Sequence, residues 1–224
     1  VLTLALITLV ALVVTEKNST LNLACVYWLA RTYELTKRYE EALSEYHTYC
    51  KFATLGGTYY PNAIVNSGKV FYQLKDYQNA IPLFEYCVSN GKKYTSSVFN
   101  DALLKLADSY NKNGMPTKTI SLFNKINKDD VGSLPYYLLM SYTGDAYKDL
   151  KEYKKAYYYN SLAKEKLSAD ATLSVTAWDE LRKEYNFKIN DTDVKKEYNK
   201  TIKDSKKTNE NANGQTTENS SSEE

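Results

Sequence analysis

The sequence predicts an all-α fold built from stacked helical hairpins, and two observations support this. Apolar residues recur at helical spacing, in paired stripes separated by short polar turns. A small residue also recurs in phase, with steps of 38, 39 and 37 residues, at Ala30, Gly68, Ala107 and Gly144. The 8 glycines and 4 prolines among 224 residues favour helices over a turn-rich β fold.

The chain begins with a continuous apolar run, "VLTLALITLVALVV", over residues 1–14. The run is shorter than the ~20 residues that cross a bilayer, and it has the length of a signal-peptide core. We therefore expect a signal or membrane-anchor segment, complete or truncated at its start, and a linker over residues 15–22. The alternative is a buried core helix without a polar face.

Each repeated copy continues with a small residue and an aromatic residue on a second helix. In the first copy these are Ala42 and Tyr46, and in the second they are Ala80 and Phe84. Small residues let the two helices of a hairpin approach closely, and the aromatic residues are expected to fill the space between successive hairpins. Because one hairpin cannot bury its faces alone, the copies are expected to stack. The predicted hairpins span residues 23–56, 61–94, 100–133 and 137–167.

This pattern resembles that of the tetratricopeptide repeat family over residues 23–167. The third copy departs from it with Thr119 in place of alanine, and the fourth departs with Asn160 in place of an aromatic residue. The resemblance implies a right-handed superhelical solenoid of about four hairpins. It also implies a concave groove, lined by the first helix of each repeat.

The copies run a few residues longer than the usual ~34. Segments such as "KYTSSVFNDALLKLADSY" look like those of bacterial envelope-associated members, including the periplasmic partner of the Tol-Pal system and outer-membrane assembly lipoproteins. Together with residues 1–14, this implies a membrane-anchored or exported protein, with the bacterial periplasm or envelope favoured. If residues 1–14 pack as a helix, a cytoplasmic location is the alternative.

Two further segments follow the repeats. Residues 168–190 are predicted to form an amphipathic capping helix, with Asp170 as its N-cap and Leu173, Trp178 and Leu181 on its apolar side. Residues 191–224 have few apolar side chains, which predicts a fraying helix and then a disordered polar tail.

The sequence does not predict an enzyme, a cofactor or a metal site. It has no GxGxxG, GxxxxGK[ST], GxSxG or HExxH motif. The single histidine, His47, and the scattered cysteines Cys25, Cys50 and Cys87 lack the spacing of zinc ligands. Buried free thiols are expected, and a Cys50–Cys87 bridge in an oxidising compartment is the alternative.

The predicted function is that of a non-enzymatic scaffold or adaptor that binds a peptide segment of a partner protein in the repeat groove. The net charge of only +2 argues against a nucleic-acid partner, and membrane contact is expected only through the N-terminal segment. The alternative is a peptide-sensing regulatory module, or an accessory domain of a larger protein whose effector or catalytic domain lies outside this chain. The oligomeric state stays open.

The resemblance also implies which side chains line the groove. Aromatic rings, amides and charges of both signs would suit an extended peptide, whose backbone needs donors and acceptors. The candidate groove residues are Tyr27, Arg31, Asn62, Asn66, Lys69, Tyr72, Asp101, Lys105, Asp108 and Tyr142.

Overall fold

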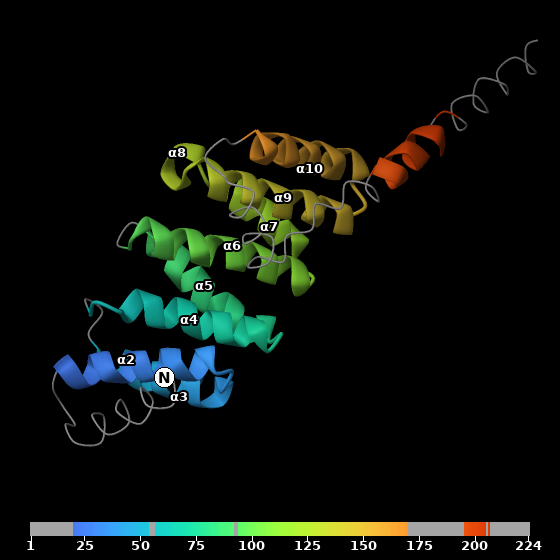
Figure 1. The fold of residues 1–224 in the computed structure, drawn as a ribbon. Helices are drawn as coiled ribbons and strands as arrows, with labels where there is room; N and C mark the ends of the chain where they lie inside the picture. The colour runs from blue at the N-terminus through green and yellow to red at the C-terminus, as the bar shows by residue number, and fades with distance from the viewer. Residues whose placement is uncertain (1–19, 54–56, 92–93, 170–194, 205, 207–224) are drawn as a thin grey trace, which may run out of the picture. The chain divides into compact units, whose positions relative to one another are not determined.

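The computed structural model describes residues 20–53, 57–91, 94–169, 195–204 and 206 (Figure 1). Throughout these residues the regular structure is helical, and no strand occurs among them. The predicted all-α fold is therefore confirmed. The chain divides into two compact units, residues 1–115 and 116–224, which are described separately below.

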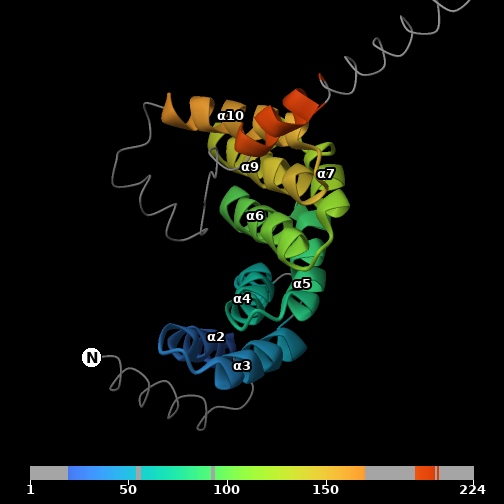
Figure 2. The same ribbon diagram turned by 90° about the vertical axis from the view of Figure 1, so that its right-hand side faces the viewer.

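The first unit contains successive hairpins of helices (Figures 1 and 2). A first helix and a second helix pair in each hairpin, and the second helix of the second hairpin also packs on the next first helix. The helices are α2 (Thr20–Leu35), α3 (Tyr39–Phe52), α4 (Tyr60–Gln73), α5 (Tyr77–Ser89) and α6 (Ser96–Lys112).

The core of the first unit contains the small and aromatic residues of the repeated pattern. Ala42 and Tyr46 of α3 and Ala80 and Phe84 of α5 are all fully buried. A Cβ atom added to Gly68 of α4 would lie 2.7 Å from Cε1 of Phe84. The glycine therefore allows the aromatic ring to pack directly against the α4 backbone of its own hairpin, whereas the sequence pattern predicted only the close approach of the two helices.

Each of the four repeat turns ends its first helix in the same way. In the first turn, Arg38 N–H donates to the Tyr33 carbonyl at 2.8 Å, and Lys37 N–H donates to the Glu34 carbonyl at 3.0 Å. This pair of bonds is a Schellman motif, which requires one residue with a positive φ angle. The positive-φ residues of the four turns are Lys37, Lys75, Gly114 and Lys151.

The second unit contains α7 (Pro116–Phe123), α8 (Lys128–Val131), α9 (Ser133–Asp149) and α10 (Tyr153–Ser168), and a further helical segment spans residues 195–204. Aromatic rings connect these helices. The centroid of the Phe123 ring lies 5.3 Å from that of Tyr136 and 5.6 Å from that of Tyr159. The Tyr157 ring of α10 stacks on Tyr198 of the last segment, with centroids 5.2 Å apart.

Asn160 replaces an aromatic residue in the fourth copy because of its contact with α9. Its side chain is 1 % exposed, and its amide group donates to Asp145 Oδ1 at 3.4 Å. A Cβ atom added to Gly144 would lie 1.9 Å from Asn160 Oδ1 and 3.1 Å from the Asn160 backbone nitrogen. The pair Gly144–Asn160 therefore gives α9 and α10 a closer approach than an aromatic ring allows.

Gly144→Ala is expected to lower the free energy of unfolding by about 1–3 kcal/mol, because the added methyl group overpacks this contact. Urea denaturation followed by circular dichroism measures the change. In an Asn160→Ala background the same substitution should cost less, since the Oδ1 atom is gone. An equal cost in both backgrounds would show that the close approach of the Asn160 side chain does not determine this packing.

Several predicted segments lie outside the described residues. These are the N-terminal segment 1–14, the predicted linker up to residue 19, the predicted capping helix from residue 170 onward and the predicted polar tail from residue 207 onward. Among the helices that the structure does describe, none combines the length and the hydrophobicity needed to cross a membrane.

Candidate partner-binding surfaces

The predicted groove residues Tyr27 and Asn66 join the first helices of the first two hairpins. The Asn66 side-chain amide on α4 donates to the Tyr27 hydroxyl on α2 at 3.3 Å. The Tyr27 ring also stacks on Tyr59, with centroids 4.5 Å apart and planes 4° apart. Burial raises the pKa of the Tyr27 hydroxyl, so this group stays neutral at physiological pH.

Five other predicted residues join α4 to α6. Lys69 forms an ion pair with Asp101, and the Tyr72 hydroxyl donates to the Asp108 carboxylate. The ammonium group of Lys105 lies 4.6 Å from the centroid of the Tyr72 ring. This distance is that of a cation–π contact, and the lysine side chain is only 4 % exposed.

Lys112 of α6 completes this cluster. Its ammonium group donates to Asp108 Oδ2 at 2.9 Å and also to the Tyr72 hydroxyl. Burial, and then the charge of Asp108, raises the pKa of Tyr72. The Tyr72 phenol therefore remains a neutral donor between a carboxylate and an ammonium group.

The other predicted residues take different positions. Arg31 donates to Glu34 of its own helix at 2.5 Å, and Glu34 also accepts a bond from the Tyr46 hydroxyl at 2.5 Å. Asn62 is half-buried near the start of α4. Tyr142 is buried on α9, in the second unit. The structure thus brings the predicted residues of the first unit together mainly in pairs that join neighbouring first helices.

One exposed aromatic residue on this surface was not predicted. Trp28 of α2 is 48 % exposed, and its ring contacts Tyr27 and Tyr59 edge-on, with centroids 5.3 Å and 5.7 Å away. Its helical position, between the buried residues Tyr27 and Leu29, places it at the edge of the apolar stripe. We call Trp28 and the predicted groove residues of α2, α4 and α6 the first-helix surface.

A second candidate surface is an apolar cleft on the side of the second helices, with a volume of about 790 Å³. Stripes from α3, α4 and α5 line it at helical spacing. We call it the second-helix cleft. Its lining residues are Glu40, Leu43, Ser44, Tyr46, His47, Cys50, Tyr60, Ile64, Ser67, Phe71, Pro82, Leu83 and Tyr86.

Pro82 lies within α5 and lines this cleft. Proline has no N–H, so it cannot donate to the carbonyl of Gln78 one turn earlier. The repeat pattern does not reveal the cleft, because its residues come from three helices in two copies. One sequence pattern does indicate part of the cleft. Leu43, His47 and Cys50 recur at helical spacing on α3, beside the core residues of that helix.

The three cysteines are free thiols in the structure. Burial raises the pKa of Cys50 to about 11, and burial together with the charge of Cys50 raises the pKa of Cys87 to about 12. Because both pKa values are raised, the two neutral thiols stabilise the folded state fully below the ordinary thiol pKa of 9.0. This stabilisation is lost as the pH rises through 11 to 12.

Alkylation should therefore be slow at Cys87 in the folded protein. The thiolate is the nucleophile, and both the raised pKa and the complete burial of Cys87 suppress its reaction with iodoacetamide near neutral pH. We expect labelling at least about tenfold slower than in urea, measured by peptide mass spectrometry. Cys50 is only half-buried and should react faster than Cys87. Equal rates at the two sites would contradict this arrangement.

Histidine, cysteine, aspartate and glutamate side chains form no group able to hold a metal ion within the described part of the chain. The polar side chains of the first-helix surface are instead bonded to one another. What the arrangement offers chemically is a set of preformed donors, acceptors and aromatic faces.

Comparisons with known proteins agree with this architecture. The family model of the tetratricopeptide repeat matches residues 101–131. The comparison with curated protein sequences gives no match.

Several solved structures share the fold. Nearly identical tetratricopeptide-like repeats of a kinesin light chain from Podosopora anserina align with a TM-score of 0.62 and 14 % identity, over 76 % of this chain and 87 % of that one. MamA from Desulfovibrio magneticus aligns with a TM-score of 0.55 and 18 % identity, over 70 % and 80 % of the two chains. BtubC from P. vanneervenii aligns with a TM-score of 0.56 and 14 % identity, over 71 % and 68 %.

Proposed function

The chain has a tetratricopeptide-repeat fold, and we propose that it is a non-enzymatic scaffold that binds an extended segment of a partner protein along its first-helix surface. The fold itself supports a role in protein–protein interaction. The observation that carries the proposal is the line of bonds that connects successive first helices. Tyr27 with Asn66 joins α2 to α4, and Lys69 with Asp101 joins α4 to α6.

These bonds fix the surface before a partner arrives. Side chains that are already ordered lose little conformational entropy on binding, so more of the contact energy is available for affinity. The ion pair Lys69–Asp101 keeps part of both side chains open to solvent. The pair can therefore donate to and accept from a peptide backbone without breaking the contact between the helices.

Trp28 is the proposed anchor of the interaction. Tryptophan is enriched among the residues that dominate binding energy, and Trp28 combines an exposed face with a fixed orientation against Tyr27 and Tyr59. Arg31 lies one helical turn further along α2 with its guanidinium group partly exposed. It is positioned to bind a carbonyl or carboxylate group of the same partner segment.

A pull-down from the source cells tests the proposal with two matched triple variants. The first-helix variant carries Trp28→Ala, Arg31→Ala and Lys69→Ala. The cleft variant carries His47→Ala, Pro82→Ala and Tyr86→Ala, at exposed positions of the second-helix cleft. Circular dichroism confirms that both remain helical. We expect a partner that the wild type and the cleft variant recover and that the first-helix variant loses.

The reverse result assigns the binding differently. If the cleft variant loses the partner and the first-helix variant keeps it, the partner binds in the second-helix cleft and our assignment is wrong. If both variants keep it, neither surface carries the interaction.

We also propose that residues 1–14 attach the chain to a membrane or direct its export, in the bacterial envelope. The support for this location is the uncharged apolar run itself. Cell fractionation of the chain with and without residues 1–14 tests it. Recovery of the full chain in the membrane or periplasmic fraction, lost when residues 1–14 are removed, would support the proposal. An unchanged distribution between the fractions would contradict it.

A further inference from the structure

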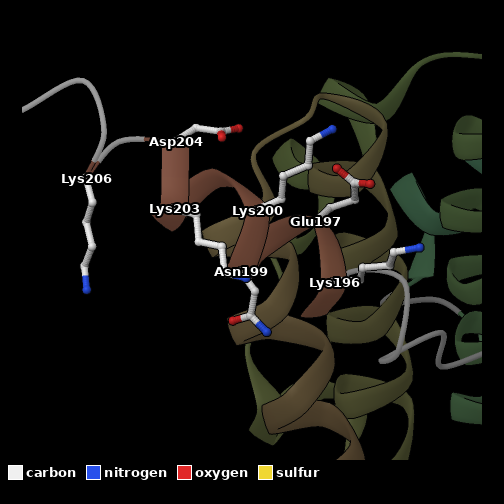
Figure 3. A pocket seen from close by; sticks show the side chains of 7 residues that line it. All are labelled: Lys196, Glu197, Asn199, Lys200, Lys203, Asp204 and Lys206. Atoms are coloured by element: carbon white, nitrogen blue, oxygen red, sulfur yellow. The ribbon is translucent and has the colours of Figure 1, made fainter. Parts of the chain in front are cut away.

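The helical segment 195–204 and the adjacent Lys206 are rich in lysine, and Figure 3 shows four of these side chains together with the carboxylates of Glu197 and Asp204. All of these lysines are exposed, and none forms an ion pair with a residue that the structure describes. The acidic residues of the same stretch are Glu197 and Asp204. The lysines are Lys195, Lys196, Lys200, Lys203 and Lys206.

Helical spacing separates this segment into two faces. Lys196, Lys200 and Lys203 lie at positions i, i+4 and i+7, which share one face of a helix. Tyr198 and Ile202 lie on the opposite face and are half-buried. We call the face of Lys196, Lys200 and Lys203 the lysine face.

The side opposite the lysine face packs on α10. The ring of Tyr198 stacks on that of Tyr157, with planes 3° apart. An apolar contact therefore holds the segment against the second unit and directs the lysine face away from α10.

The lysine face carries a local repulsion. Like charges at i and i+4, as in Lys196 and Lys200, repel each other. Glu197 and Asp204 border the face, at i−3 and i+4 from Lys200, and offset part of this repulsion. A bound anion would relieve the remainder, because it would neutralise the ammonium groups.

We propose that the lysine face binds the anionic headgroups of a membrane surface. Headgroups present phosphate and carboxylate groups in a plane, which three parallel lysine side chains on one helix face can contact together. Lysine side chains are flexible point charges that suit such a surface. This contact is separate from the first-helix surface and adds to the membrane contact expected of residues 1–14.

The chemistry of the face favours lipid over nucleic acid. Residues 195–206 contain lysine and no arginine, whereas arginine is the residue that binds phosphates and bases in a bidentate manner. Single-stranded nucleic acids also need exposed aromatic rings on which their bases stack. The aromatic residue of this segment, Tyr198, is instead stacked on Tyr157.

Vesicle co-sedimentation of the full chain tests the proposal. The probes are vesicles of phosphatidylcholine alone and of phosphatidylcholine with phosphatidylserine. The variant Lys196→Gln, Lys200→Gln, Lys203→Gln should bind the acidic vesicles about a hundredfold more weakly than the wild type. Both proteins should bind the neutral vesicles equally, because residues 1–14 are uncharged and unchanged. Added salt should weaken the wild-type binding to acidic vesicles.

A matched control removes the same charge elsewhere in the second unit. Lys118→Gln, Lys125→Gln, Lys128→Gln alters three exposed lysines of other segments and should leave binding to acidic vesicles nearly unchanged. An equal loss in the control would show that only net charge matters, and would overturn the proposal. The proposal also fails if the lysine-face variant binds acidic vesicles as well as the wild type does. Tighter binding to a single-stranded oligonucleotide than to vesicles, lost in the same variant, would assign the face to nucleic acid instead.

Discussion

Replacing Phe84 with alanine is expected to lower the free energy of unfolding by about 3–5 kcal/mol. The ring is fully buried, and it packs against the α4 backbone at Gly68. Its removal loses the transfer energy of the ring and leaves a cavity between two hairpin helices that cannot collapse fully. Urea denaturation of the full chain measures the change. Phe71→Ala is the matched control, because Phe71 is only half-buried beside the second-helix cleft and should cost less.

A second substitution tests the contact itself. Gly68→Ala alone should destabilise the protein, because its methyl group would lie 2.7 Å from the Phe84 ring. In the Phe84→Ala background the same methyl group enters the vacated space and should be nearly neutral. The double variant should then lose less stability than the sum of the two single variants. Additive effects would contradict direct packing of the ring on Gly68.

Replacing Asp108 with alanine is expected to lower the free energy of unfolding by about 2–3 kcal/mol. The carboxylate accepts from the Tyr72 hydroxyl and from Lys112, so its removal leaves a buried donor and a charge without their acceptor. The value lies below the 3–5 kcal/mol typical of a broken buried ion pair, because the Lys112 side chain is 30 % exposed and can reach water.

The control for this prediction is a double-mutant cycle with Tyr72→Phe. Tyr72→Phe alone leaves Asp108 bonded to Lys112 and should cost about 1 kcal/mol. If the bond between the two residues is real, the double variant should lose less stability than the sum of the single variants. A purely additive cycle would show that Asp108 acts through Lys112 alone.

The pH dependence gives an independent check of the same cluster. The pKa of Tyr72 is raised above the ordinary 10.0 by burial and by Asp108. Because this pKa is raised, the neutral Tyr72 phenol stabilises the folded state fully below pH 10. This stabilisation is lost as the pH rises above 10. Asp108→Ala removes part of the shift. The total loss of stability above pH 10 should therefore be smaller in this variant than in the wild type, because its decline ends at a lower pH.

The sequence was sufficient to predict the all-α fold because the repeat pattern is local. A small residue, a turn and an aromatic residue recur in phase, and each hairpin places them in contact with neighbours close in sequence. Gly68 and Phe84 illustrate how short these contacts are in sequence, since they lie on the two helices of one hairpin and meet in the structure. Asn160 departs from the pattern, and the sequence alone gives no reason for it. Its short distance to Gly144 in the structure explains the departure.

The candidate surfaces were less predictable because their properties depend on neighbouring hairpins. Lys105 and Asp108 are polar residues on a first helix, and resemblance alone placed them in a groove. Their burial follows from contacts with Tyr72 on the preceding first helix, which no single copy contains. The second-helix cleft needs residues from two copies. Whether the predicted groove residues bind a partner stays a prediction.

Three of the four repeat turns contain a strained lysine, and relieving this strain would stabilise the protein. Lys37, Lys75 and Lys151 adopt the left-handed conformation that only Gly114 adopts without steric cost. A side chain in this conformation costs about 1–2 kcal/mol. Glycine in place of these three lysines would relieve that strain, offset in part by its larger backbone entropy in the unfolded chain. The gains should add, because each turn closes its own hairpin, so thermal tolerance could be tuned one hairpin at a time without altering either binding surface.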